Sequence, residues 1–325
     1  MNKIRVALLA GGDSSEREVA LRSAKAVKEA FDRDKYDVTL IDVHGKQWCY
    51  VDSNGGRWPL NKDDFSLTVS GVRYEFDYAF IIIHGTPGEN GMLQGYLDIM
   101  HVPYSTGGVV PMAVTFDKVT CKRVVASVGI LQAKDVLLRR GDEVNADKIV
   151  EKLGLPLFVK PNASGSSCGV TKVKCVEELA KAVEVAFGES DAVLIEEFLA
   201  GREMACGVLI TDKKRVLMPV TEIVPKNDFF DYEAKYTAGM SSEITPAQIP
   251  DELRDELQGL AEKAYRICGC KGLARVDFMV TDNGPYMIEI NAIPGMGVGS
   301  IVPQQIEAMG MNMGEVLDLI VEDTI

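Results

Sequence analysis

The feature that most constrains the fold is a nearly continuous apolar run at residues 4–10, close to the start of the chain. A strand that is apolar on both faces is typical of a parallel sheet covered by helices on both sides. A helical pattern follows, in which Ser15 and Glu18 have the spacing of a capping box. Further strands are expected at residues 38–43 and 78–83. This alternation predicts an α/β unit with a doubly wound parallel sheet.

Charge and cysteine content narrow the choice of partners and compartment. Acidic residues outnumber basic residues by 48 to 35, which gives a formal net charge of -13. So acidic a chain repels a phosphate backbone, and we expect no nucleic-acid partner. The sequence has no apolar run of membrane-spanning length and no segment like a signal peptide, so we expect no membrane association. Seven cysteines without a zinc-like spacing are typical of reduced thiols and predict a cytoplasmic location.

The pattern changes near residue 106, and three domains are expected. An N-terminal α/β substrate domain covers residues 1–105, a central domain residues 106–200, and a C-terminal domain residues 201–325. Helical patterns, β segments and two hairpins are mixed in the last two, which predicts α+β units. Within the third domain, residues 225–242 form a long connection rich in aromatic residues, which we interpret as a lid.

A glycine-serine loop at residues 162–169 lies between two β segments, with Lys160 at its entry. Small residues let backbone amides approach phosphate oxygens, and a lysine supplies the compensating charge. An ordinary flexible hairpin turn explains the loop equally well on this evidence alone.

A second hairpin carries the most specific chemistry. If its turn is centred on Asn283, Asp277 lies opposite Glu289 and Arg275 lies opposite Asn291, all on one face. Hard oxygen ligands of this kind suit Mg²⁺, which binds through one or two carboxylates and substrate phosphates. A cross-strand ion pair is the structural alternative. Two neighbouring carboxylates repel each other unless a cation lies between them, so we favour the metal site.

Residues 292–300 follow this hairpin directly and contain three glycines after a proline. Such a segment permits close approach of the backbone to a ligand, and the Gly295 amide could bind a developing oxyanion beside Arg275. A plain surface connection is the alternative. Glu16 and His84 are weaker candidates: Glu16 suits a helix start in any case, and His84 ends a strand where open α/β sheets bind ligands.

Together these segments resemble the D-alanine–D-alanine ligase family of the ATP-grasp superfamily. The matching pieces occur in the family's order: GGDSSEREV, HGTPGENGMLQG, PYSTGG, FDKVTCK, KPNASGSSCGV, IEEFLAGRE, FFDYEAKY, ARVDF, IEINAIPGM and SIVP. The resemblance implies a three-domain ATP-grasp architecture in which two α+β domains clamp ATP. It implies an ATP-dependent ligase that joins two D-alanines through an acyl phosphate for peptidoglycan precursor synthesis, and a homodimer.

The resemblance also implies a role for each matching residue. Lys118, Lys160 and Lys235 would bind ATP phosphates, Glu196 and Glu203 the adenosine, and Asp277, Glu289 and Asn291 two Mg²⁺ ions, with Mn²⁺ as an alternative. Glu16 would bind the ammonium of the first D-alanine near His84. Ser166, in the loop over ATP, and Tyr236, in the lid, would bond to Glu16. Arg275 and the Gly295 amide would stabilise the oxyanion, and Ser300 would receive the second D-alanine's carboxylate.

Four positions depart from the family pattern. Asn90 and Ala20 stand where Asp and Ser are usual, and Ala292 and Gly297 each stand where Thr is usual. The last two lie on the expected acceptor side, so they bear on the identity of the second substrate. The alternatives are an ATP-grasp ligase with another amino or hydroxy acid as acceptor, and a nucleotide-binding module without catalysis.

Overall fold

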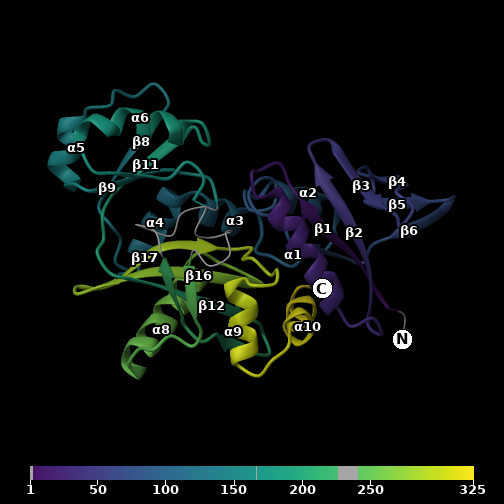
Figure 1. Ribbon diagram of the computed structural model, residues 1–325. Helices are drawn as coiled ribbons and strands as arrows, with labels where there is room; N and C mark the ends of the chain where they lie inside the picture. Colours follow the sequence, from purple (N-terminus) through teal and green to yellow (C-terminus); the bar gives the residue numbers. More distant parts are fainter. Residues whose placement is uncertain (1–2, 166, 226–240) are drawn as a thin grey trace.

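The structure is a computed structural model that describes residues 3–165, 167–225 and 241–325. The strands of these residues form three sheets, each with its own helices (Figure 1). The C-terminal end of the chain lies beside the N-terminal sheet. The expected lid, residues 225–242, and the side chains of Ser166, Lys235 and Tyr236 lie outside the described residues, apart from backbone at the lid's two ends.

The N-terminal sheet has seven strands in the order β6-β5-β4-β3-β2-β1-β7. Its strands are β1 (Ile4–Gly11), β2 (Tyr36–His44), β3 (Gln47–Val51), β4 (Arg57–Asn61), β5 (Ser66–Val69), β6 (Val72–Glu75) and β7 (Tyr78–Ile81). The expected parallel arrangement holds for β2, β1 and β7. The other four strands add an antiparallel meander that the sequence analysis did not predict. Short turns suffice to join antiparallel neighbours, whereas parallel strands need a crossover.

The start of α1 (Arg17–Ala30) differs from the prediction. Glu16 occupies the N-cap position and its side chain makes no capping bond, so the Ser15–Glu18 capping box is wrong. Instead, the Ser14 hydroxyl accepts from the Glu16 amide at 3.2 Å and donates to the His84 carbonyl at 2.8 Å. This bond links the helix start to the segment after β7. That strand ends at Ile81 rather than at residue 83, although the side chains up to His84 stay buried.

The central sheet has four antiparallel strands in the order β10-β9-β11-β8. Its strands are β8 (Asp135–Arg139), β9 (Leu157–Pro161), β10 (Thr171–Val173) and β11 (Ala192–Glu197). Two amphipathic helices, α5 (Ala146–Leu153) and α6 (Val176–Phe187), bury their apolar faces against it and form a separate small core. The predicted glycine-serine loop connects β9 to β10 at the edge of this sheet.

The third sheet has six strands, with β15-β14-β12-β16-β17 in order and β13 paired to β12. Its strands are β12 (Arg202–Ile210), β13 (Arg215–Leu217), β14 (Thr221–Pro225), β15 (Ser241–Ile244), β16 (Leu273–Thr281) and β17 (Gly284–Asn291). One core cluster packs α4 (Lys118–Ala126) and α8 (Asp251–Ile267) against it. Another helix, α3 (Val109–Phe116), leads into α4.

The predicted register of the second hairpin is confirmed: Asp277 pairs with Glu289, and Arg275 pairs with Asn291. The turn itself is one residue tighter than expected, because Thr281 pairs with Gly284. Opposite the step from Asp277 to Phe278, β17 contains one extra residue, which forms a β-bulge. This bulge shifts the pairing by one residue and so restores the predicted register at Asp277. The bulge therefore decides which side chains share the functional face.

The end of the chain returns to its beginning. Both α9 (Ile301–Ala308) and α10 (Met313–Thr324) contribute buried residues to the same core cluster as β1 and β7. Helix α10 packs beside α1, and Tyr78 of β7 is hydrogen-bonded to Thr324. The last helix thus completes the core that covers the N-terminal sheet. Helix α2 (Met92–Met100) lies beside α3.

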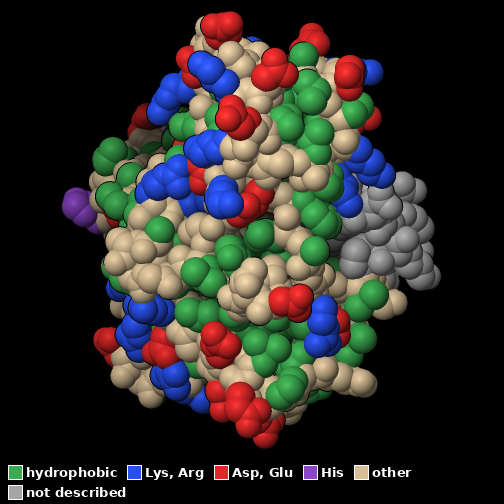
Figure 2. Space-filling view, turned by 90° about the vertical axis from the view of Figure 1, so that its left-hand side faces the viewer, with side chains coloured by type: hydrophobic (Ala, Val, Ile, Leu, Met, Phe, Trp, Pro, Cys, Tyr) green, Lys and Arg blue, Asp and Glu red, His purple; other side chains and the backbone are tan. Residues whose placement is uncertain are grey.

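Acidic and basic side chains are interspersed on the face drawn in Figure 2, rather than gathered by sign. Among the described helices, none has the length and apolar character required to cross a bilayer.

Candidate active site

Two cavities meet at the second hairpin. The first lies between the central and third sheets, and the second lies between the N-terminal sheet and the start of α9. The first is lined by six of the predicted residues, namely Lys118, Lys160, Glu196, Glu203, Asp277 and Glu289. The second is lined by six others, namely Glu16, His84, Arg275, Asn291, Gly295 and Ser300. Gly165 lines both cavities. The second cavity, of about 610 Å³, has room for two small amino acids.

The start of α4 contributes Lys118 to the wall of the first cavity. Asp117 caps this helix by accepting from the Thr120 amide at 2.8 Å. The Asn162 side chain accepts from the Val119 amide at 2.9 Å and donates to Asp117 at 2.6 Å, so the helix start and the glycine-serine loop are one unit. Lys118 Nζ donates to the Ser164 carbonyl at 2.7 Å. The loop and helix hold this ammonium at the wall of the cavity.

The hairpin places two carboxylates between two cations. Arg275 donates to Asp277 through Nε and Nη2, both at 2.7 Å, and Lys118 Nζ lies 3.3 Å from Glu289 Oε2. The Asn291 amide nitrogen donates to Asp277 at 3.0 Å. Burial opposes the charged form of Arg275, but the Asp277 carboxylate raises its pKa above the usual value. The ion pair is therefore within one strand, not across the hairpin as the structural alternative supposed.

This donor set fits a magnesium ion. Asp277 and Glu289 supply hard carboxylate oxygens on one face, and the bond from the Asn291 nitrogen keeps the amide oxygen as a further donor. The carboxylates line the first cavity, where phosphate oxygens would complete the coordination.

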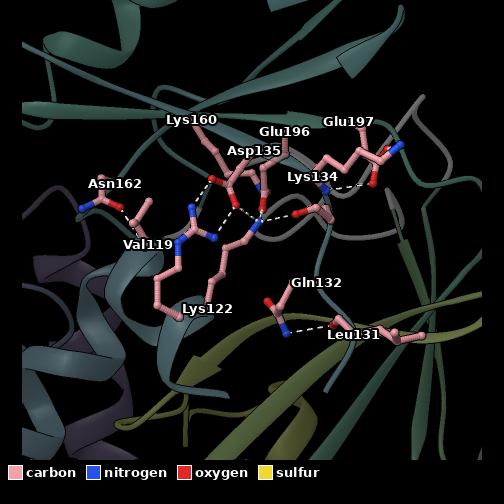
Figure 3. Close-up of polar contacts among 12 residues, drawn as sticks. Val119, Lys122, Leu131, Gln132, Lys134, Asp135, Lys160, Asn162, Glu196 and Glu197 are labelled. Carbon is pink, nitrogen blue, oxygen red and sulfur yellow. Dashed lines mark hydrogen bonds and ion pairs between the residues drawn. The ribbon is translucent and has the colours of Figure 1, made fainter. Parts of the chain in front are cut away.

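An ion-pair network extends from the wall of the first cavity into the protein behind it (Figure 3). One carboxylate oxygen of Glu196 is paired with Lys122 and the other with Lys160. Lys122 Nζ also lies 3.2 Å from Asp135 Oδ2, and Arg123 binds the same carboxylate. Burial would raise the pKa of Glu196, yet the two lysines hold that pKa below its ordinary value.

Glu16 lies against the glycine-serine loop from the other side. A Cβ atom added at Gly165 would be 2.1 Å from Glu16 Oε2, so only glycine permits this approach. The Glu16 side chain is buried, 7% exposed, at the start of α1. The loop beside the first cavity and the acid that lines the second are therefore in direct contact.

His84 is buried and neutral. Its Nδ1 is 2.9 Å from the Ile293 carbonyl, which only accepts, so Nδ1 carries the proton. Desolvation lowers the pKa of the ring. Nε2 has no hydrogen-bond partner among the residues that the structure describes, and its lone pair can accept from a bound ammonium. Glu89 lines the same cavity, and burial together with the charge of Glu16 raises the pKa of Glu89 to about 8.

In the segment after the hairpin, Gly295 lies close to Ser300. A Cβ atom at Gly295 would be 3.0 Å from Ser300 Oγ. Ser300 is the N-cap residue of α9, but its side chain makes no capping bond. The helix start therefore directs amides and a hydroxyl group toward the cavity, an arrangement that favours a carboxylate.

The predicted residues thus separate into two groups that share one hairpin, while the roles assigned to them stay predictions. The sequence analysis missed Glu89, Lys122 and Asp135. Lys122 follows Lys118 by one helical turn, which places both on one helix face and could have indicated it. Glu89 lies five residues after His84 in the same motif. Asp135 carries no comparable indication in the sequence.

Comparison with known proteins identifies the family. The model of the D-ala D-ala ligase N-terminus matches residues 5–107, and that of the D-ala D-ala ligase C-terminus matches residues 124–322. A D-alanine–D-alanine ligase from Phocaeicola vulgatus is 44% identical over 322 residues, covering 99% of both chains. One from Flavobacterium johnsoniae is 43% identical over 317 residues, covering 98% of both.

Solved structures agree. D-alanyl-alanine synthetase A from Vibrio cholerae superposes with a TM-score of 0.89 at 29% identity, over 100% of this chain and 99% of that one. The VanG D-Ala:D-Ser ligase from Enterococcus faecalis gives 0.87 at 32% identity, over 99% of both chains. A D-alanine–D-alanine ligase from Bacillus anthracis, solved in complex with ATP, gives 0.78 at 29% identity, over 98% of this chain and 97% of that one.

The fold is that of an ATP-grasp enzyme, as the resemblance implied. The chain belongs to the D-alanine–D-alanine ligase family.

Proposed function

We propose that this chain is an ATP-dependent ligase that joins two D-alanines into D-alanyl-D-alanine for peptidoglycan precursor synthesis. The observation that carries the proposal is the position of the hairpin β16–β17. Asp277 and Glu289 line the first cavity, and Arg275 and Asn291, on the same face, line the second. A phosphate in one cavity and an amino-acid carboxylate in the other would meet at this face.

The chemistry needs both cavities. A carboxylate is a poor electrophile, so a carboxylate oxygen of the first D-alanine attacks the γ-phosphorus of ATP. The bond from that phosphorus to the bridging oxygen breaks, ADP leaves, and an acyl phosphate forms. The amine of the second D-alanine then attacks the acyl carbon, and phosphate leaves. Lys118 and Lys160 would position the phosphates and balance their charge, since catalysis of phosphoryl transfer is mainly positioning and electrostatics.

Two Mg²⁺ ions, or Mn²⁺ as an alternative, would be held by Asp277, Glu289 and Asn291, and would neutralise charge that develops on the transferred phosphoryl group. Arg275 and the Gly295 amide would bind the oxyanion of the tetrahedral intermediate. Glu203, Lys235 and Ser166 keep their predicted roles at ATP.

In the second cavity, Glu16 would pair with the ammonium of the first D-alanine, and His84 Nε2 would accept a hydrogen bond from the same group. Tyr236 and Ser166 would fix Glu16. Ser300, with the amides at the start of α9, would bind the carboxylate of the second D-alanine. Exclusion of water by the expected lid, residues 225–242, would protect the acyl phosphate from hydrolysis.

A different acceptor is the second candidate. Gly297 lines the second cavity and has no side chain where the family pattern has Thr, which leaves this side wider and less polar. Ala292, expected on the same side, instead lines a separate small cavity. One structural relative is a D-Ala:D-Ser ligase. Reaction of D-alanine as donor with a panel of D-alanine, D-serine and D-lactate as acceptors separates the candidates.

We further propose a cytoplasmic homodimer. Met92, Ile99 and Val110 on α2 and α3 are 67%, 71% and 69% exposed, and a second copy would cover these apolar side chains. Light scattering of the wild type and of Ile99→Lys tests the dimer.

The experiment for the reaction is phosphate release from ATP together with dipeptide detection, with D-alanine compared against L-alanine. Formation of ADP and dipeptide from D-alanine alone supports the proposal. Equal turnover of both enantiomers would contradict it.

A further inference from the structure

Lys122 is a buried charge that no step of the proposed reaction uses. It lies on α4 one turn after Lys118, and it is 1% exposed. It is absent from the residues that line either cavity among those described. Its ammonium donates to the Ala133 carbonyl at 3.0 Å and to Glu196, and lies 3.2 Å from Asp135. A buried lysine needs such partners, but the partners here also connect it to the nucleotide side.

The connection runs through Glu196. Its Oε1 is paired with Lys122 and its Oε2 with Lys160, from opposite sides (Figure 3). Lys160 lines the first cavity, whereas Lys122 lies behind it. Burial lowers the pKa of Lys160, but the charges of Glu196 and of two further acids raise it overall, so Lys160 stays charged.

The balance of cations and acids in this network depends on where Lys160 is bound. With Lys160 included, three cations (Lys122, Arg123, Lys160) face two acids (Asp135, Glu196). If Lys160 transfers to a phosphate, two cations and two acids remain, and Glu196 is still paired with Lys122. Without Lys122, the same transfer would leave the Glu196 carboxylate buried without its cation, which is strongly unfavourable.

We infer that Lys122 is a positioning residue for the nucleotide: it holds Glu196 so that Lys160 can exchange this carboxylate for a phosphate. The inference rests on the proposed function in taking ATP as the ligand. It also assigns Glu196 a role beyond the expected contact with adenosine, as the carboxylate that holds Lys160 until a phosphate arrives.

The test is a double-mutant cycle of Lys122→Met and Glu196→Gln, with the dissociation constant for magnesium–ADP measured by calorimetry. Methionine keeps the length of the side chain and removes the charge. Lys122→Met should weaken binding about tenfold, while kcat at saturating ATP and the KM for D-alanine stay within about twofold. In the Glu196→Gln background the same change should cost less than about threefold, because no carboxylate then retains Lys160.

Equal losses in both backgrounds would overturn the inference, as would a loss confined to kcat. If Lys122→Met alone does not fold, the comparison of Glu196→Gln with the double variant still decides, and a further tenfold loss there counts against it. Lys134→Met is the matched control. Lys134 pairs with the neighbouring Glu197 at 3.5 Å, but its side chain is 69% exposed, so nucleotide affinity should not change. Wild-type dipeptide formation tests the proposed function separately from this cycle.

Discussion

The two cavities differ in how their charges are arranged before any substrate arrives. In the first cavity, Lys118 and Lys160 are each paired with a carboxylate. In the second cavity, Glu16 and Glu89 lie near a neutral histidine, and the raised pKa of Glu89 leaves it mostly protonated at neutral pH. We therefore expect the first cavity to bind an anion by exchanging the partners of its cations, and the second to offer acceptors to an ammonium group.

Removal of a carboxylate of the hairpin should have the largest effect and tests the proposed role of the first cavity. Glu289→Gln should lower kcat at least about a hundredfold, because the carboxylate charge that would hold Mg²⁺ is lost, while the melting temperature stays within about 2 °C. Activity and thermal unfolding of the same preparation give the answer. Glu322→Gln, which breaks an exposed pair with Lys213, is the control. A large loss of melting temperature with intact ATP turnover would show that Glu289 holds the hairpin together.

Glu16→Gln tests the proposed role of the second cavity in binding the ammonium group of D-alanine. Loss of the carboxylate leaves the substrate ammonium without its buried partner, which costs roughly 3–5 kcal/mol. Use of D-alanine should therefore fall by about a hundredfold or more, while affinity for magnesium–ADP changes less than about threefold. Steady-state kinetics and calorimetry measure the two quantities. Comparable losses in both would mean that Glu16 serves the start of α1 rather than the substrate.

Ser300→Ala distinguishes the proposed donor and acceptor positions within the second cavity. Removal of a hydrogen bond to a charged carboxylate costs about 1.5–3 kcal/mol, so the KM for the acceptor D-alanine should rise at least about tenfold. The KM for the donor should hardly change. Initial rates over a range of D-alanine concentrations resolve the two sites. Ser127→Ala, at the exposed end of α4, should leave both values as in the wild type.

A last prediction concerns Glu89 and pH. Burial raises its pKa from 4.5 to about 8 in the folded protein, so the folded state binds the proton more tightly than the unfolded state. Its contribution to stability is full below about pH 4.5 and is lost as the pH rises through about 8. Glu89→Gln should therefore gain melting temperature relative to the wild type between these values. A difference that is constant with pH would contradict the raised pKa.

The hairpin shows what local patterns can predict. Alternation along each strand and the position of the turn place Arg275, Asp277, Glu289 and Asn291 on one face, and the structure has the predicted pairs. The bulge that makes this register fit a tighter turn was not predictable, because it depends on packing of both strands. Similarly, the antiparallel meander β3–β6 follows from tertiary pairing, since its strands are short and largely exposed.

Residues that act through other residues were harder to find. Lys122, Asp135 and Glu196 come from three different segments, and only the sheet pairing of β8 with β11 brings the two acids together. Sequence reasoning placed Glu196 at the nucleotide by resemblance, but nothing local indicated that its partner lies on α4. A motif can indicate the chemistry of an individual residue, whereas an ion pair between distant segments can be recognised only once the fold is known.

The return of α10 to the N-terminal sheet affects how the chain can be made. Val316, Leu317, Ile320 and Val321 of this helix belong to the same core as β1 and β7. During synthesis, that sheet emerges from the ribosome first but must wait for the last helix before its apolar surface is covered. The central sheet, whose core is entirely its own, can close much earlier. The unit built around the N-terminal sheet is therefore the last to become complete, and until then it is the part of the nascent chain that most needs protection from aggregation.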